Sequence, residues 1–173
     1  MNLVTLGKKF FILALSMMLF SACGYKPSSK YARNVLGNKI STSVIISAQD
    51  PENTVLIKEA VDSALVEIFH TSLTPAKYAD THLSIQLVTP PYAPIQYNSD
   101  GFVVGYRATI ILYITRESKD VKKKYTARGT YDFAVLPNAV LTDQERFDAI
   151  KFGAAKAISS FIAQVSAEGS SKK

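Results

Sequence analysis

The sequence is poor in residues that crosslink a fold or hold a metal ion. It has one cysteine and two histidines among 173 residues. A single cysteine excludes an internal disulfide, and together with only two scattered histidines it also excludes a cysteine-rich metal site. His70 and His82 have no metal-binding spacing, and neither a phosphate loop nor a Gly-x-Ser-x-Gly nucleophile motif is present. The sequence therefore predicts no catalytic residue, no cofactor and no metal.

Apolar runs long enough to span a bilayer are also missing. The longest one, 10–20, is about half of the roughly 20 residues that a membrane-spanning helix needs. It follows Lys8 and Lys9 and ends at the small residues Ser21 and Ala22. A basic patch, a short apolar run and small residues are typical of an export signal. We expect residues 1–22 to be a signal peptide.

Cys23 comes directly after the expected cleavage site. Phe20-Ser21-Ala22-Cys23 resembles the bacterial lipobox, whose cysteine is acylated and becomes the mature N-terminus; Phe20 stands where leucine is usual. The alternative is an ordinary secretory peptide with a chance cysteine. Gly24 replaces the aspartate that favours retention in the inner membrane in several bacteria. We therefore expect a lipid anchor at Cys23 in the outer membrane, on its periplasmic side, and an irregular tether over 23–39.

Net charge restricts the partners. The chain carries +6, which becomes +4 once Lys8 and Lys9 are removed with the signal. This charge favours an anionic partner but is too small to indicate nucleic acid. We expect no nucleic-acid partner.

Alternating and β-branched runs predict four strands, over 40–47, 83–87, 102–115 and 124–135. The long third and fourth strands flank a charged hairpin and are expected to pair antiparallel. Pro90, Pro91 and Pro94 follow the second strand, which indicates a sheet edge or an irregular end.

Two helices are predicted. The first begins at Asp50-Pro51 and ends before Pro75, because proline is tolerated at a helix start and apolar residues recur at the helical period. The second begins at a capping box, Thr142 to Glu145, and ends near Gly169.

The order β-α-β-β-β-α favours an α+β fold. We expect a two-layer α/β sandwich, in which a four-stranded, mainly antiparallel sheet carries both helices on one face. The single domain is expected to cover 40–169, with a loose tail over 170–173. The other face of the sheet is left open for a partner.

Basic side chains are the candidate binding residues. They gather at and after the hairpin and in the polar phase of the two long strands, and each could bind phosphate or carboxylate groups. A solvated strand end that discourages aggregation explains the same lysines without a ligand. The candidate anion contacts are Arg107, Lys122, Lys123, Lys124 and Arg128.

The mature chain resembles the LptE family, lipoproteins of the machinery that assembles lipopolysaccharide in the outer membrane. The resemblance lies in the element order and in four local features: Ala22-Cys23-Gly24-Tyr25, the Asp100-Gly101 turn, the following strand with Tyr106, and a terminal helix with Arg146, Ala149 and Ala157.

The resemblance implies a protein without catalytic activity that plugs an LptD-like outer-membrane β-barrel and assists the insertion of lipopolysaccharide or a related glycolipid. Because lipopolysaccharide carries phosphates and acidic sugars, the basic residues above are its expected contacts. Another envelope adaptor, such as a secretion pilotin or a cell-wall synthase activator, is the alternative.

Overall fold

The computed structural model describes residues 28–46, 54–69, 73–88, 90–119, 121–137 and 139–171. The predicted signal peptide, Cys23 and the predicted helix start at Asp50-Pro51 lie outside these residues. Among the described helices, none combines the length and apolarity needed to cross a membrane. In chain order, the elements are α2 (Ser28–Leu36), β1 (Ile40–Ile46), α3 (Thr54–Phe69), the short 3-10 helix η1 (Ala76–Tyr78), β2 (Thr81–Leu87), β3 (Tyr92–Tyr97), β4 (Val103–Ser118), β5 (Val121–Ala134) and α4 (Asp143–Ser171).

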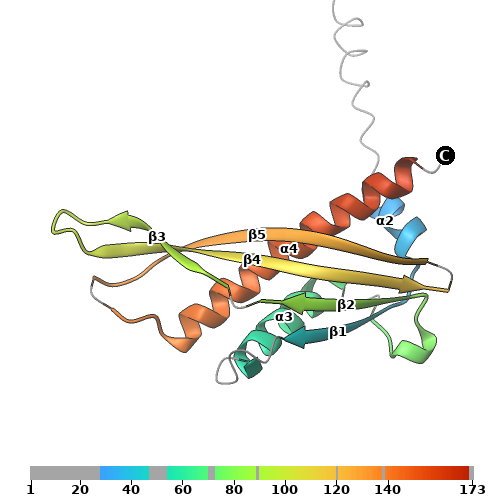
Figure 1. The fold of residues 1–173 in the computed structure, drawn as a ribbon, viewed down its shortest axis with the longest axis horizontal. Coiled ribbons are helices and arrows are strands. Elements are labelled where there is room, and N and C mark those ends of the chain that lie inside the picture. Colours follow the sequence, from blue (N-terminus) through green and yellow to red (C-terminus); the bar gives the residue numbers. More distant parts are fainter. Residues whose placement is uncertain are drawn as a thin grey trace, which may run out of the picture.

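The sheet is built around the long strand β4. Strand β5 pairs antiparallel along one edge of β4, whereas β2 and β3 pair antiparallel with successive parts of the other edge. Strand β1 lies outside β2 and is parallel to it. Both helices α3 and α4 lie on one side of the sheet (Figure 1). The predicted α+β sandwich with a mainly antiparallel sheet and helices on one face is confirmed.

The predicted number of strands is wrong, because the structure has five. The missed strand, β3, continues the path of β2 along β4 after the break at Pro90 and Pro91. The Pro91 carbonyl still accepts a hydrogen bond from the Thr109 N–H, at 3.2 Å. Proline within β3 is tolerated because β3 is an edge strand, where an N–H that faces away from β4 needs no partner in the sheet.

The core lies between the sheet and the helices. Alternate residues of β2 and β4 point into it, as do the predicted apolar stripes of α3 and α4. Phe161 of α4, Leu65 of α3 and Leu112 of β4 are at most 1% exposed. The predicted capping box also forms: the Glu145 N–H donates to Thr142 Oγ1, and the Thr142 N–H donates to Glu145 Oε2. These contacts fix the first turn of α4.

Helix α4 touches the backbone of β5 without intervening side chains. A Cβ atom on Gly129 of β5 would lie 2.1 Å from the Gly153 carbonyl oxygen and 2.5 Å from the Ala157 nitrogen. A Cβ atom on Gly153 would lie 2.4 Å from Cγ1 of Ile110. Such distances are far below van der Waals contact, so glycine at both positions allows the helix to pack this closely.

Both ends of the domain differ from the prediction. The irregular tether predicted over 23–39 is wrong for Ser28–Leu36, which form α2, and the loose tail is wrong for Ser170 and Ser171, which extend α4. Gly169 does not end α4. A Cβ atom there would lie 2.5 Å from the Tyr31 carbonyl oxygen, so this glycine lets α2 pack against the helix. The whole of helix α2 was thus mistaken for a linker.

The close contact between α4 and β5 predicts a large effect of a single methyl group. We expect Gly129→Ala to lower the free energy of unfolding by about 3 kcal/mol, because the backbone of α4 must move away from the sheet. Gly105→Ala on β4 is the control, since its Cβ would lie 3.1 Å from Gln96 Cβ, and a shift of a few tenths of an ångström in the edge strand β3 relieves that contact. Urea denaturation measures both variants, and equal stability of the two would contradict the proposed packing.

Candidate functional site

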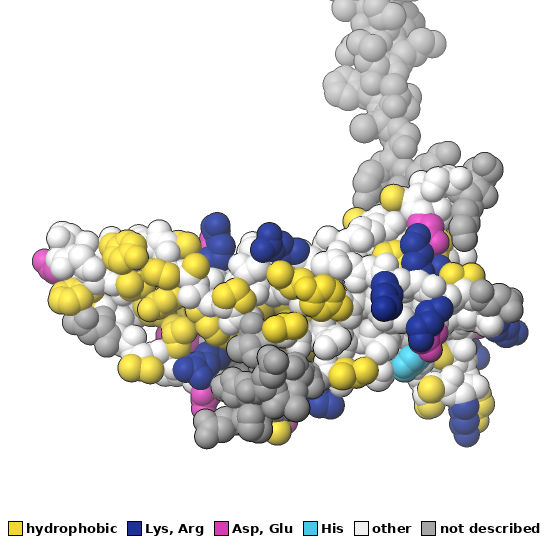
Figure 2. Space-filling model, viewed as in Figure 1, with side chains coloured by type: hydrophobic (Ala, Val, Ile, Leu, Met, Phe, Trp, Pro, Cys, Tyr) yellow, Lys and Arg dark blue, Asp and Glu magenta, His cyan; other side chains and the backbone are white. Residues whose placement is uncertain are grey.

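The face of the sheet opposite the helices is the candidate site, and we call it the open face. Strand alternation places the odd-numbered side chains of β4 and the even-numbered side chains of β5 there, because Ile110, Leu112 and Ile114 of β4 point into the core. Figure 2 looks onto this face. Hydrophobic side chains gather toward the β3–β4 end, and a group of basic side chains lies toward the other end.

Two of the five predicted anion contacts are available on the open face. Lys124 and Arg128 lie on the same side of β5, four residues apart, and both are exposed. Neither has a hydrogen bond or ion pair with another described residue. A separation of four strand residues corresponds to roughly 13 Å. Tyr113 of β4, which is 47% exposed, pairs with Thr126 between them. The open face therefore presents two free cations beside an exposed aromatic ring.

Two other predicted contacts are on the same face but are already paired. The guanidinium of Arg107 donates twice to the carboxylate of Asp132, at 2.7 Å each. This contact lowers the pKa of Asp132, so the pair stays ionised. Lys122 forms an ion pair with Glu117 across the β4–β5 pairing, and its hydrogen bond lowers the pKa of the glutamate. An anionic ligand would have to compete with these carboxylates.

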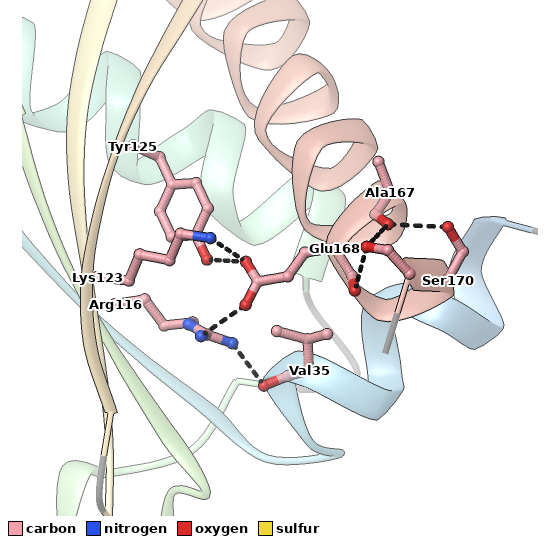
Figure 3. Close-up of polar contacts among 8 residues, drawn as sticks. Val35, Arg116, Lys123, Tyr125, Ala167, Glu168 and Ser170 are labelled. Carbon is pink, nitrogen blue, oxygen red and sulfur yellow. Dashed lines mark hydrogen bonds and ion pairs between the residues drawn. The ribbon is translucent and has the colours of Figure 1, made fainter. Parts of the chain in front are cut away.

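Lys123 lies on the other face of the sheet, because it is one residue out of phase with its neighbours. Its ammonium donates to Glu168 Oε2 at 2.8 Å, and the Tyr125 hydroxyl donates to the same oxygen at 2.7 Å. Arg116 donates to Glu168 Oε1 at 3.3 Å. Figure 3 shows these side chains converging on Glu168 near the end of α4. The structure therefore removes Lys123 from the open face and places it in what we call the Glu168 cluster.

Contacts within the Glu168 cluster shift the pKa values of Glu168 and Tyr125 away from their ordinary values. The hydrogen bond from Lys123 is the main reason why the pKa of Glu168 falls to about 2, and the Tyr125 hydrogen bond and Arg116 charge act in the same direction. Burial and the contact with Glu168 raise the pKa of Tyr125 to about 12. Arg116 is only 2% exposed and also donates to the Val35 carbonyl of α2 at 3.1 Å. The cluster links β4, β5, α4 and α2.

Sequence reasoning missed a polar cluster on the open face of β1 and β2. His82 Nδ1 lies 2.8 Å from Ser41 Oγ, and His82 Nε2 lies 3.1 Å from Ser43 Oγ. Both serines are on the neighbouring parallel strand, about 40 residues earlier in the chain. The parallel register of β1 against β2 brings these serines to the histidine, and no pattern local in the sequence shows that register.

The tyrosines of the sheet divide between its two faces. Tyr106 and Tyr131 contact Phe133 on the side of the helices, with ring centroids 6.2 Å apart in each case. Tyr131 also packs on Phe152 of α4 at 5.0 Å. Tyr97 and Tyr113 are instead exposed. The first group extends the core beneath the β3–β4 end, whereas the second is available to a partner.

Comparison with known proteins gives one family match. The family model described as "LptE: Lipopolysaccharide-assembly" matches residues 41–165. No curated protein matches the chain.

Several solved structures are similar at low sequence identity. A candidate lipoprotein from Caulobacter crescentus CB15 is 10% identical, with a TM-score of 0.49, and the match covers 86% of this chain and 98% of that one. Rare lipoprotein B from Shewanella oneidensis is 12% identical, with a TM-score of 0.34 and coverage of 76% and 92%. A PelC dodecamer from Paraburkholderia phytofirmans is 14% identical, with a TM-score of 0.43 and coverage of 75% and 91%.

The Glu168 cluster predicts a pH-dependent stability. The pKa of Glu168 is lowered from 4.5 to about 2, so its contribution is complete above pH 4.5 and is lost as the pH falls toward 2. We expect Glu168→Gln to lower the free energy of unfolding by roughly 2 kcal/mol at pH 7 and by much less near pH 2. Urea denaturation at a series of pH values measures this difference.

Glu67→Gln serves as the control. The Glu67 side chain is 61% exposed, and its ion pair with Lys151 is long, with 3.5 Å between Oε2 and Nζ. Its effect should be small at every pH. A Glu168→Gln effect that stays constant down to pH 2 would show that the ionised carboxylate does not stabilise the fold.

Proposed function

Because the chain belongs to the LptE family of lipopolysaccharide-assembly proteins, we propose that it is a lipoprotein of the outer membrane that binds lipopolysaccharide or a related glycolipid. Acyl chains on Cys23 hold it on the periplasmic side. Its partner is an LptD-like β-barrel, which it plugs and assists during insertion of the glycolipid. Its role is binding and positioning, without a catalytic step.

The observation that carries this proposal is the family match over 41–165, which spans β1 to most of α4. The asymmetry of the sheet supports it. One face is covered by α3 and α4, whereas the open face has no helix against it among the described elements (Figure 1). A partner or ligand can therefore reach the open face without disturbing the core.

The charges of the open face favour an amphiphilic anion. Lys124 and Arg128 are exposed and free of carboxylates in the described part of the chain, so they can contact phosphate without breaking an existing ion pair. Arg128 can make two parallel hydrogen bonds to phosphate, whereas Lys124 acts as a point charge. Tyr113 offers apolar area next to them. Lipopolysaccharide combines phosphates and acidic sugars with acyl chains, and this arrangement suits it.

The test of the proposed partner is isolation of the native lipidated protein from its own envelope. We expect a large β-barrel to co-purify in stoichiometric amount through size-exclusion chromatography. Recovery with a periplasmic synthase or a secretion ring, and with no barrel, would refute the proposal.

The test of the proposed ligand is the removal of the free cations. We expect the double variant Lys124→Gln and Arg128→Gln to bind lipopolysaccharide roughly a hundredfold more weakly, since each lost charge-assisted hydrogen bond weakens binding about tenfold or more. The difference should shrink at high salt, which screens exposed charges. Binding is measured by titration of purified protein with lipopolysaccharide.

The charge-matched control is Lys151→Gln with Lys156→Gln, because both lysines belong to α4 on the other side of the sheet. This control should bind almost as well as the wild type. Equal losses in the two double variants would indicate a non-specific effect of net charge and would refute the open face as the binding site.

A further inference from the structure

The outer strands of the sheet differ in how their free edges are protected. Strands β1, β3 and β5 each pair with only one other described strand. Strand β3 carries Pro94 and two register shifts, and the start of β1 is closed by the Thr74 N–H, which donates to the Ile40 carbonyl at 2.9 Å. Strand β5 has neither a proline nor a bulge along its 14 residues. Because prolines and bulges discourage pairing with another chain, β5 has the least protected edge among the described strands.

Alternate residues of β5 direct their backbone groups away from β4. The Val135 N–H donates to the Val104 carbonyl at 3.0 Å, which shows that the odd-numbered residues of this strand bond to β4. The Thr126 carbonyl accordingly faces outward, where the side chain of Gln164 of α4 donates to it at 3.0 Å. The N–H and C=O groups of residues 128, 130, 132 and 134 therefore also face outward.

The chain itself closes only one part of this edge. Figure 1 shows α4 passing behind β5, so that its last turns lie beyond the β5 edge and its first turns do not. Gln164 belongs to those later turns, and the exposed Lys122 and Lys124 lie on the same part of β5. From Arg128 to Ala134, by contrast, the structure describes no element that pairs with the outward groups. We call residues 128–134 the free edge.

Exposed aromatic surface lies beside the free edge on the helix side of the sheet. Tyr131 of β5 packs on Phe152 of α4 with ring centroids 5.0 Å apart, and Phe152 is 40% exposed. A strand added at the free edge would place every second side chain about 5 Å from its neighbour on β5, on the side of this ring pair. Apolar residues at those alternate positions would cover the rings.

The charges beside the free edge are mainly positive. Arg128 is exposed on the open face, and on the helix side the Lys156 ammonium lies 5.7 Å from the Tyr131 ring centroid. Neither cation has an ion pair with a described residue, whereas Asp132 is engaged by Arg107. A neutral or acidic segment therefore fits this edge better than a basic one, because like charges on neighbouring strands repel.

We propose that the free edge pairs, main chain to main chain, with an extended segment of the β-barrel partner that is neutral or acidic and carries apolar residues at alternate positions. The inference rests on the barrel partner of the proposed function and names the surface that this partner contacts. Wall strands of a closed barrel have no free edge, so the segment comes from a loop or a terminal extension that reaches the lumen. Main-chain hydrogen bonds supply affinity, and the alternate side chains supply specificity. The open face stays accessible to the glycolipid, because the pairing uses only the edge of the sheet.

The experiment removes single outward N–H groups from the full lipidated chain. Proline at position 130 replaces an N–H that pairs with no described strand, and its ring occupies the space where the added strand would lie. We expect Thr130→Pro to weaken the complex with the barrel roughly tenfold or more, because a carbonyl of the partner segment is left unpaired. The measurement is the molar ratio of barrel to lipidated protein that survives serial dilution in detergent, after isolation from the native envelope.

Matched variants separate the free edge from the side chain and from the fold. Thr126→Pro removes an outward N–H from the part of the edge that α4 closes, and Thr130→Val keeps the N–H, so both should retain the barrel as the wild type does. Urea denaturation checks that each variant folds. Ala134→Pro, at the last residue of β5, is a second test variant and should weaken the complex as Thr130→Pro does.

A photoreactive phenylalanine analogue in place of Phe152 identifies what lies beside the free edge. We expect an adduct with a loop or a terminal segment of the barrel protein, located by mass spectrometry. Adducts only with wall strands, or with a second copy of this chain, would assign a different occupant and overturn the inference.

The outcomes separate this inference from the proposed function. Barrel retention by Thr130→Pro and Ala134→Pro at the level of the wild type would overturn the edge pairing while leaving the barrel partner and the glycolipid site intact. Equal losses in Thr126→Pro and Thr130→Pro would also overturn it, since only position 130 belongs to the free edge. Absence of a barrel from the wild-type preparation would refute the proposed partner and this inference together.

Discussion

The rest of the structure depends on the direct contact between the backbones of α4 and β5. At Gly129 the backbone of the helix lies so close to β5 that a Cβ atom does not fit between them, and at Gly153 the helix lies directly on the Ile110 side chain of β4. This contact holds the long helix against the β4–β5 pair, where Phe161 and Ile158 are fully buried in the core. It also brings the last turns of α4 to the end of the sheet, where Glu168 meets Arg116, Lys123 and Tyr125. The polar cluster and the docked α2 follow from that position.

The helices that cover one face of the sheet determine which kinds of side chain are left for the open face. Because the apolar residues of β2, β4 and β5 are used by the helices, the open face is left with hydroxyl groups, charged side chains and a few exposed apolar ones. Cross-strand neighbours then decide which charges are free. Arg107 meets Asp132 and Lys122 meets Glu117, whereas Lys124 and Arg128 lie opposite Thr115 and Ile111 and keep their charge available. The distribution of free charge on the open face is therefore defined by register as much as by composition.

This dependence on register explains how far the sequence could predict the molecule. Apolar periodicity located both long helices and the long strands, and a four-residue motif located the capping box at Thr142. Each of these features is encoded by residues close in the chain. Strand β3 was missed because neither of its faces is buried, so its residues show no apolar alternation. Helix α2 was missed because it buries little beyond Ala32 and Leu36. Gly169 was misread because its role is the approach of a helix more than 130 residues away in sequence. The sequence identified the candidate cations by residue type. Which of them form ion pairs depends on neighbours that only the folded structure brings together.

The central claim is that the open face of the sheet receives the glycolipid. Site-specific photocrosslinking in cells tests it most directly, with a photoreactive amino acid in place of Tyr113 on the open face or of Ala163 on the exposed side of α4. The account predicts lipopolysaccharide adducts at position 113 and none above background at 163. Adducts at 163 in equal yield, or no adduct at 113 while the protein is stably anchored, would contradict it.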